Sequence, residues 1–262
     1  MKKKIALILC FVLAFACMVP AMASYLQNTD LDHYKYMNVY KDGKDTYVKP
    51  DQPITRGELA NVIFNLLNSN TKNVHIQNYT NFSDLSEDHE FFKQINFLVY
   101  RGFLTGYPDG TFRPDGVLTR AELAEVVVRT QKYVRNITTI KAPDIEGHWA
   151  MGAINTMIIR GFMKGYPDGT FKPDNILTRA EVAATMNRVY NRELDSSSIL
   201  QNTRLINSIT NQVVTPYDFK QIFPDLPVDH WAYDAMMEAC VSHRIYWDDV
   251  GKREIWVQEL YD

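Results

Sequence analysis

Three arginines occupy the same place in a four-residue stretch that occurs three times. The copies are Thr-Arg-Gly-Glu at 55–58 and Thr-Arg-Ala-Glu at 119–122 and 178–181, so the arginines are Arg56, Arg120 and Arg179. Threonine followed three residues later by glutamate predicts a capping box at a helix start. The helix dipole disfavours a cation in the first turn by roughly 0.3–1 kcal/mol, so a repeated arginine there indicates a functional reason. First-turn amides bind anions, and an arginine beside them would strengthen such a site. The pattern predicts an anion-binding site, unless the arginines pair with acids such as Asp115 or Asp174.

The segments that must position these arginines are predicted to be amphipathic helices. Apolar residues follow the first two copies at helical spacing: Leu59, Val62, Ile63, Leu66 and Leu67 after the first, and Leu123, Val126 and Val127 after the second. Each arginine is therefore expected in the first turn of a helix with one buried face.

A longer unit surrounds the last two copies, because residues 82–133 and 143–190 repeat each other. Both contain Gly-Tyr-Pro-Asp-Gly-Thr-Phe, at 106–112 and 165–171. In the second unit a helix is expected from near His148, ending at Arg160-Gly161-Phe162 with glycine in the left-handed position. A tight turn follows, in which Asp109 and Asp168 are expected only to shape the backbone, and an extended connector leads to the capped helix.

Incomplete units are predicted at both ends. Residues 40–50 imitate the turn, and at best a weak first helix precedes it at 25–39. Residues 192–221 are polar, with a helix expected around 199–209. Phe-Pro-Asp at 223–225 and His-Trp-Ala at 230–232 restart the unit, with a helix to about His243. This last half-unit is expected to lie beside the first and to close a ring of three, which would hide the apolar faces of terminal repeats.

Composition indicates an exported, folded protein. The 262 residues are 46% hydrophobic and 23% charged with a net charge of −3, which argues against nucleic acid as a partner. Residues 1–23 match a secretory signal with a basic start, an apolar stretch and Ala-Met-Ala before the expected cleavage site. No later segment is expected to cross a membrane. Cys240 is the only cysteine outside the signal and is expected in the core.

These motifs resemble the S-layer homology (SLH) domain, over about residues 39–190 and 223–245. The resemblance implies a mainly α fold of tandem helix-turn-helix repeats, forming a pseudo-threefold spindle around a central helix bundle. We expect a signal peptide at 1–23, a degenerate repeat 1 at 24–70, repeat 2 at 82–135 and repeat 3 at 143–191. An insertion is expected at 192–222, and a partial repeat at 223–262 is expected to complete the spindle.

The resemblance implies non-covalent attachment of an exported protein to the cell wall or S-layer of a bacterium, with a Gram-positive source favoured. The implied ligand is a secondary cell-wall polysaccharide, often pyruvylated and therefore anionic, bound in grooves between repeats. Another surface protein is a second candidate partner. No cofactor and no metal are expected.

The family pattern implies these glycan-binding residues: Arg120, Arg179, Arg56, Trp149, Trp231, Gly106, Gly165, Asp84, Asp144 and Asp225. The tryptophans either stack on sugar rings or pack in the core, and the two glycines would let a ligand approach the backbone. The three aspartates either contribute to the site or cap the following helix. Glu90 stands where repeat 3 has Trp149 and is expected to repel an anionic sugar. One or two competent grooves are therefore expected, with Arg120 and Arg179 ahead of Arg56.

Three other functions are alternatives to anchoring. Enzymatic activity is disfavoured because the acids recur in equivalent turns, whereas a hydrolase has one asymmetric pair. A calcium site is disfavoured because the turn offers too few alternating oxygen ligands. A surface interaction scaffold of the same fold, with weak or no glycan binding, stays open, and Glu90 and the degenerate ends favour it.

Overall fold

The computed structural model describes residues 32–67, 72, 79–192, 205–206, 213–214, 222–248 and 253–259. The predicted signal peptide at 1–23 lies outside the described residues. Among the residues that are described, no helix has both the length and the apolar character that crossing a bilayer requires.

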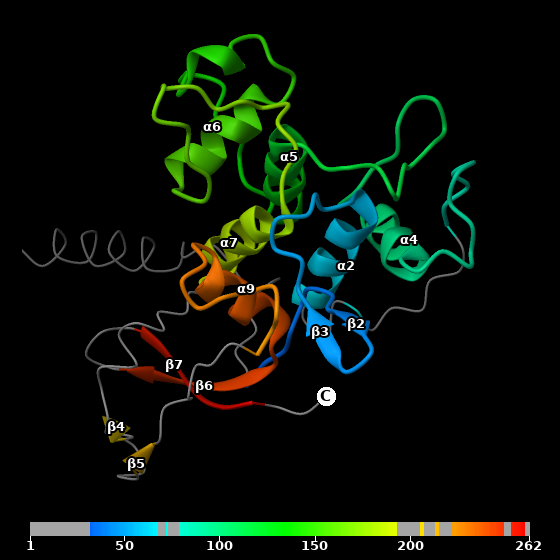
Figure 1. Ribbon diagram of the computed structural model, residues 1–262. Helices are drawn as coiled ribbons and strands as arrows, with labels where there is room; N and C mark the ends of the chain where they lie inside the picture. Colours follow the sequence, from blue (N-terminus) through cyan, green and yellow to red (C-terminus); the bar gives the residue numbers. More distant parts are fainter. Residues whose placement is uncertain are drawn as a thin grey trace, which may run out of the picture.

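The described part of the chain is mainly helical, as expected, and its α-helices contact one another in pairs (Figure 1). The pairs are α2 with α4, α5 with α6, and α7 with α9. Their bounds are α2 Arg56–Leu66, α4 Phe92–Tyr100, α5 Arg120–Thr130, α6 Met151–Ile159, α7 Arg179–Tyr190 and α9 Tyr233–Cys240, with a 3₁₀ turn η1 at Pro143–Ile145.

All three predicted capping boxes are present. The side chains of Thr55, Thr119 and Thr178 accept from the amide of the glutamate three residues on, and each glutamate carboxylate accepts the threonine N–H at 2.9 Å. The three arginines therefore begin helices α2, α5 and α7, as the sequence predicts.

The segments before these helices meet in a closed cycle of backbone hydrogen bonds. Leu118 N–H donates to Ile54 C=O (3.1 Å), Ile54 N–H to Leu177 C=O (3.1 Å), and Leu177 N–H to Leu118 C=O (2.9 Å). All three side chains are fully buried. Each capped helix is consequently fixed relative to the other two just before its start, two residues ahead of its first residue.

The predicted helix stops and turns are also present. Gly102 and Gly161 have φ of 71° and 74°, and Phe103 N–H donates back to Leu98 C=O at 2.8 Å, as in a Schellman motif. Asp109 accepts from the amide and hydroxyl of Thr111 inside its turn. Asp168 and Thr170 repeat this arrangement.

The first half-unit is completed by contacts from the last. Asp84 accepts the amides of Phe112 and Arg113 within its own unit, and Asp144 does the same for Phe171 and Lys172. Asp225 instead accepts the amides of Val48 and Lys49, at 3.1 and 2.7 Å, from the N-terminal segment. Residues far apart in the sequence thus make the contact that each internal unit makes with itself.

Strands occupy places where helices were expected. Residues 32–39 contain β1 (Asp32–His33) and no helix, and Leu205–Ile206 is strand β4, paired with β5 (Val213–Val214). The helix expected around 199–209 is therefore wrong at the described positions. Helix α9 ends at Cys240, because the following residues extend into β6.

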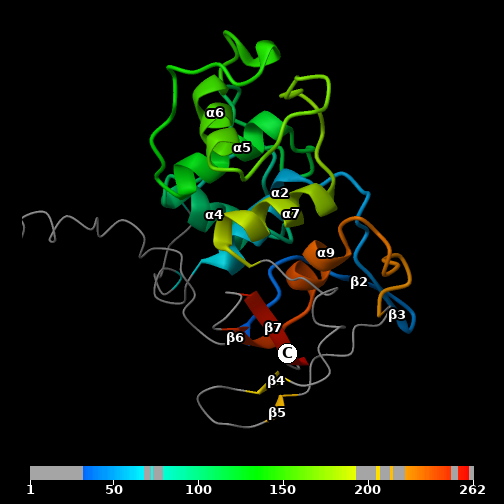
Figure 2. The same ribbon diagram turned by 90° about the vertical axis from the view of Figure 1, so that its left-hand side faces the viewer.

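The C-terminal end forms a sheet that includes the N-terminal strand. β6 (His243–Asp248) pairs antiparallel with β7 (Arg253–Glu259) and with β1, in the order β1-β6-β7. Figure 2 shows β6 and β7 beside α9 and away from α5 and α6. A separate hairpin, β2 (Tyr40–Asp42) and β3 (Asp45–Tyr47), forms the degenerate turn of the first unit.

Candidate functional site

The three arginines point inward and are buried, with exposed fractions of 9% for Arg56, 8% for Arg120 and 1% for Arg179. Each guanidinium reaches from the start of its helix to the turn of the next unit, where Nε donates to a carbonyl. The acceptors are Phe112, Phe171 and Val48, at 2.8–2.9 Å. We define a junction as this contact and name the three by their arginines.

The expected anion seat made of open first-turn amides is wrong. Arg56 N–H donates to Gly116 C=O and Gly57 N–H donates to Pro114 C=O, at 2.9 and 2.8 Å, and the equivalent amides of α5 and α7 have equivalent acceptors. The amides are used because each helix start docks against the neighbouring unit. Only the guanidinium remains as a donor to an anion.

Two of the junctions contain a carboxylate bound to the arginine. At the Arg56 junction, Nη1 lies 3.2 Å from Glu122 Oε1, which also accepts from the hydroxyl of Tyr107 at 2.8 Å. At the Arg179 junction, Nη1 lies 2.6 Å from Glu58 Oε1, which accepts from Tyr40. The arginines thus pair with capping-box glutamates of the next unit.

The predicted partners Asp115 and Asp174 are instead paired with histidines. They lie 3.5 Å from Nε2 of His89 and His148, respectively. His230 makes the same approach to Asp51 at 3.6 Å.

The Arg120 junction differs from the other two. Arg120 Nε and Nη2 donate to the carbonyls of Phe171 (2.8 Å) and Lys164 (2.7 Å), and no carboxylate lies within ion-pair distance among the described residues. Glu181 holds the position equivalent to Glu122 and Glu58, and its carboxylate accepts the capping bond from Thr178 N–H. Burial lowers the pKa of Arg120, while Tyr166 and Glu181 oppose that effect. Within the described part of the chain, Nη1 of Arg120 thus makes no hydrogen bond or ion pair.

A tyrosine in each turn lies between two cations, a feature that the sequence analysis missed. The Tyr107 ring has Arg56 at 4.7 Å and Arg113 at 4.1 Å, and the Tyr166 ring has Arg120 at 5.1 Å and Lys172 at 4.2 Å. The signal was available, since the turn motif repeats tyrosine and a basic residue follows its phenylalanine. These basic residues adopt positive φ, 58° at Arg113 and 55° at Lys172, and so does Lys49, at 51°, which follows Val48 in the first unit.

Both candidate tryptophans are on the surface, so the core-packing alternative is wrong. Trp149 is 64% exposed and Trp231 is 63% exposed. The preceding histidines are neighbours, with ring centroids at 5.5 Å for His148 and 5.9 Å for His230. Glu90, at the equivalent place in the second unit, is exposed as well.

The remaining candidates have structural roles in the described contacts. A Cβ on Gly106 would lie 2.2 Å from Phe82 Cε1, and one on Gly165 would lie 2.9 Å from Thr170 O. Tight packing thus requires glycine there without any ligand. Asp84, Asp144 and Asp225 accept connector amides and do not cap the following helix.

A comparison with protein families matches the S-layer homology domain to residues 81–124 and 143–183. The chain is 32% identical over 234 residues to the "Cellulosome-anchoring protein" of Acetivibrio thermocellus, covering 87% of this chain and 47% of the relative. It is 33% identical over 242 residues to "Cell surface glycoprotein 1" of the same organism, covering 88% of this chain and 9% of the relative.

A "Surface layer protein" of Brevibacillus choshinensis is 28% identical over 122 residues, covering 43% of this chain and 11% of the relative. The chain therefore spans about half the length, or less, of the curated relatives it matches. The repeated capping boxes, the repeated turns and these similarities agree, and the chain is an S-layer homology domain protein of the cell surface with two matched SLH repeats.

Proposed function

We propose that this chain anchors an exported protein non-covalently to the bacterial cell wall by binding secondary cell-wall polysaccharide. The proposed site is the Arg120 junction, together with Trp149 of the next unit, which is the unit that Arg120 contacts. The names of the relatives support a surface-anchoring role, and the choice of junction rests on the contacts of the three arginines.

The main support for this choice of site is that Arg120 alone among the three arginines lacks a bound carboxylate in the described part of the chain. A guanidinium paired with glutamate is already neutralised, so an added sugar carboxylate would compete with a fixed partner. An unpaired Nη1 can instead form a charge-assisted hydrogen bond, which is stronger than a neutral one. We therefore propose that an acidic sugar is held at Arg120.

The exposed Trp149 supports the same junction. Ala121, next to Arg120, donates its amide to Pro173 C=O at 2.9 Å, and the following Asp174 faces His148, the neighbour of Trp149. An aromatic face that is already exposed can cover a sugar ring without any rearrangement of the core. Charge recognition at Arg120 and stacking at Trp149 together suit an anionic saccharide.

We also propose that the units form a pseudo-threefold spindle. The closed backbone cycle through Ile54, Leu118 and Leu177 supports it, as does the contact of Asp225 with the first half-unit. In this arrangement the N-terminal and C-terminal half-units act as one repeat, and the junctions become three equivalent grooves.

The test is retention of the purified chain on cell-wall sacculi, before and after removal of the secondary polysaccharide. Retention by intact sacculi alone supports the proposal. Arg120→Lys keeps the charge but loses the planar fork and is expected to weaken retention.

The alternative is a surface interaction scaffold of the same fold. It is favoured by the neutralised arginines at two junctions and by the exposed Glu90. Equal retention by stripped and intact sacculi, or no retention by either, would favour the scaffold.

A further inference from the structure

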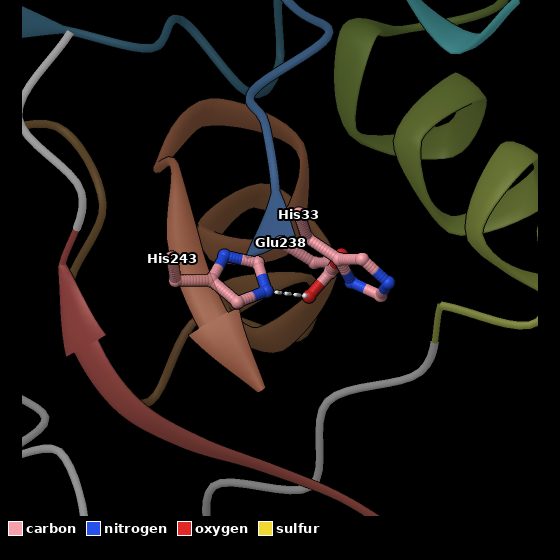
Figure 3. A group of neighbouring side chains, drawn as sticks. All are labelled: His33, Glu238 and His243. Atoms are coloured by element: carbon pink, nitrogen blue, oxygen red, sulfur yellow. Dashed lines mark hydrogen bonds and ion pairs between the residues drawn. The ribbon is translucent and has the colours of Figure 1, made fainter. Parts of the chain in front are cut away.

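A buried cluster of titratable side chains joins the two ends of the described chain and plays no part in the junctions. Figure 3 shows His33 from β1, Glu238 from α9 and His243 from β6 converging on one another. Their exposed fractions are 5%, 0% and 0%, and Arg192, just after α7, is 7% exposed beside them.

Glu238 is the centre of this cluster. Its Oε1 accepts from Arg192 Nε at 2.7 Å and lies 3.1 Å from His33 Nδ1, and its Oε2 lies 3.1 Å from His243 Nε2. Burial alone would raise the pKa of Glu238, but Arg192 and His243 hold it well below its ordinary value. The carboxylate is therefore charged and faces more than one donor.

Both ring nitrogens of His243 face oxygen atoms. Nδ1 lies 2.8 Å from the carbonyl of Val241, while Nε2 faces the Glu238 carboxylate. A neutral imidazole donates from one nitrogen only, so either neutral tautomer would leave a lone pair against an oxygen in a fully buried site. An imidazolium donates from both nitrogens and satisfies both contacts.

The other described histidines of the repeats have the opposite pattern. Nδ1 of His89, His148 and His230 accepts the amide two residues on, at 3.1–3.2 Å. Such a nitrogen carries a lone pair, so these rings are neutral with the proton on Nε2. The chain thus contains its own matched controls for His243.

From this geometry we infer that His243 is a buried imidazolium, and that its proton fastens the C-terminal hairpin and β1 to α9. Among the side chains that the structure describes, charged and titratable groups facing it include Glu238 from α9, His33 from β1 at a ring-centroid distance of 5.3 Å, and Arg192 through Glu238. On β7, Glu259 is its backbone register partner. The proton links elements that lie far apart in the sequence.

A metal ion could also satisfy His243, since the donor atoms of His33, Glu238 and His243 lie within 4.8 Å of one another. The set offers three ligands where structural zinc takes four. Arg192 already compensates the carboxylate, so a dication would leave a larger uncompensated buried charge than a proton does. The proton is favoured, and the metal becomes an outcome of the test.

The experiment is nitrogen-15 NMR of the histidine rings in the intact, chelator-treated chain at pH 7.5, with zinc content measured beforehand. We expect two protonated nitrogens on His243 and a single protonated nitrogen on His148. A neutral His243 ring would overturn the inference. Stoichiometric zinc, with the His243 signals changing on its removal, would overturn it in favour of the metal.

A pH series adds a readout that does not depend on signal assignment. A histidine whose pKa is raised on folding stabilises the fold below its unfolded pKa, about 6.5, and this contribution is lost as pH rises through the folded pKa. The folding equilibrium constant is expected to fall by up to about tenfold per pH unit in that window. Glu238→Gln should reduce this slope, because it removes the carboxylate that pairs with His243. An unchanged slope would contradict the inference.

Discussion

Gly57 and Phe91 form a size-matched pair across the Arg56 junction, and changing one should reverse the effect of changing the other. The other capped helices have Ala121 and Ala180 at the position of Gly57, and the other units have Ala150 and Ala232 at that of Phe91. A Cβ on Gly57 would lie 2.8 Å from Phe91 Cδ2 and 3.1 Å from Pro114 O. The helix start cannot easily withdraw, because Gly57 N–H donates to that same carbonyl.

The expected magnitudes follow from these distances. Overpacking in a filled core costs roughly 1–3 kcal/mol, and alanine in place of glycine returns up to about 1 kcal/mol of helix propensity. Gly57→Ala should therefore destabilise the chain by about 1–2 kcal/mol. With Phe91→Ala the closest contact is gone and only the one with Pro114 O remains, so the same change should stabilise by up to about 1 kcal/mol.

A double-mutant cycle measured by urea unfolding of the whole chain tests this pair. Phe91→Ala alone should cost about 3–5 kcal/mol, and the coupling between the two changes should be about 2 kcal/mol, within the range for residues in contact. The reasoning is refuted if Gly57→Ala has the same effect in both backgrounds.

Three further outcomes are expected. Asp225→Ala should lower the free energy of unfolding by about 2–3 kcal/mol, because the amides of Val48 and Lys49 lose a charged acceptor. Hydrogen exchange should show that these two amides lose protection, and retained protection would contradict the contact. Hydrogen bonds from the Thr170 hydroxyl and amide lower the pKa of Asp168 to about 2, so its stabilising contribution is present above its unfolded pKa near 3.9 and lost as pH falls toward 2; a carboxyl NMR midpoint near 3.9 would contradict this. Burial raises the pKa of Cys240 to about 12, so iodoacetamide at pH 8 should modify it, by peptide mapping, only after denaturant is added.

Features encoded by neighbouring residues were predictable from the sequence. The capping boxes, the glycine stops and the turns at Asp109 and Asp168 depend on side chains within a few residues of one another, and the structure confirms them. The starts of α2, α5 and α7 followed from these signals, and the buried position of Cys240 was also confirmed.

Contacts between units could not be predicted in the same way. The partner of Arg56 is Glu122 of the next unit, and a sequence does not show which of several acids a folded chain brings close. The nearby Asp115 was therefore an attractive but wrong candidate. Strand β6 was missed because it is paired by β1, from the other end of the chain.

Equilibrium binding of purified wall polysaccharide to Trp149→Ala and Trp231→Ala tests the central claim most directly. The two tryptophans have the same exposure, 64% and 63%, so neither change should disturb the core. They lie near different junctions. His230, next to Trp231, faces Asp51. The following residue, Gln52, accepts the amide of Arg179, which is paired with Glu58. We predict that Trp149→Ala weakens binding by about tenfold, equivalent to about 1.4 kcal/mol, while Trp231→Ala changes it by less than about twofold. Equal losses, or a larger loss in Trp231→Ala, would contradict the assignment of the glycan to the Arg120 junction.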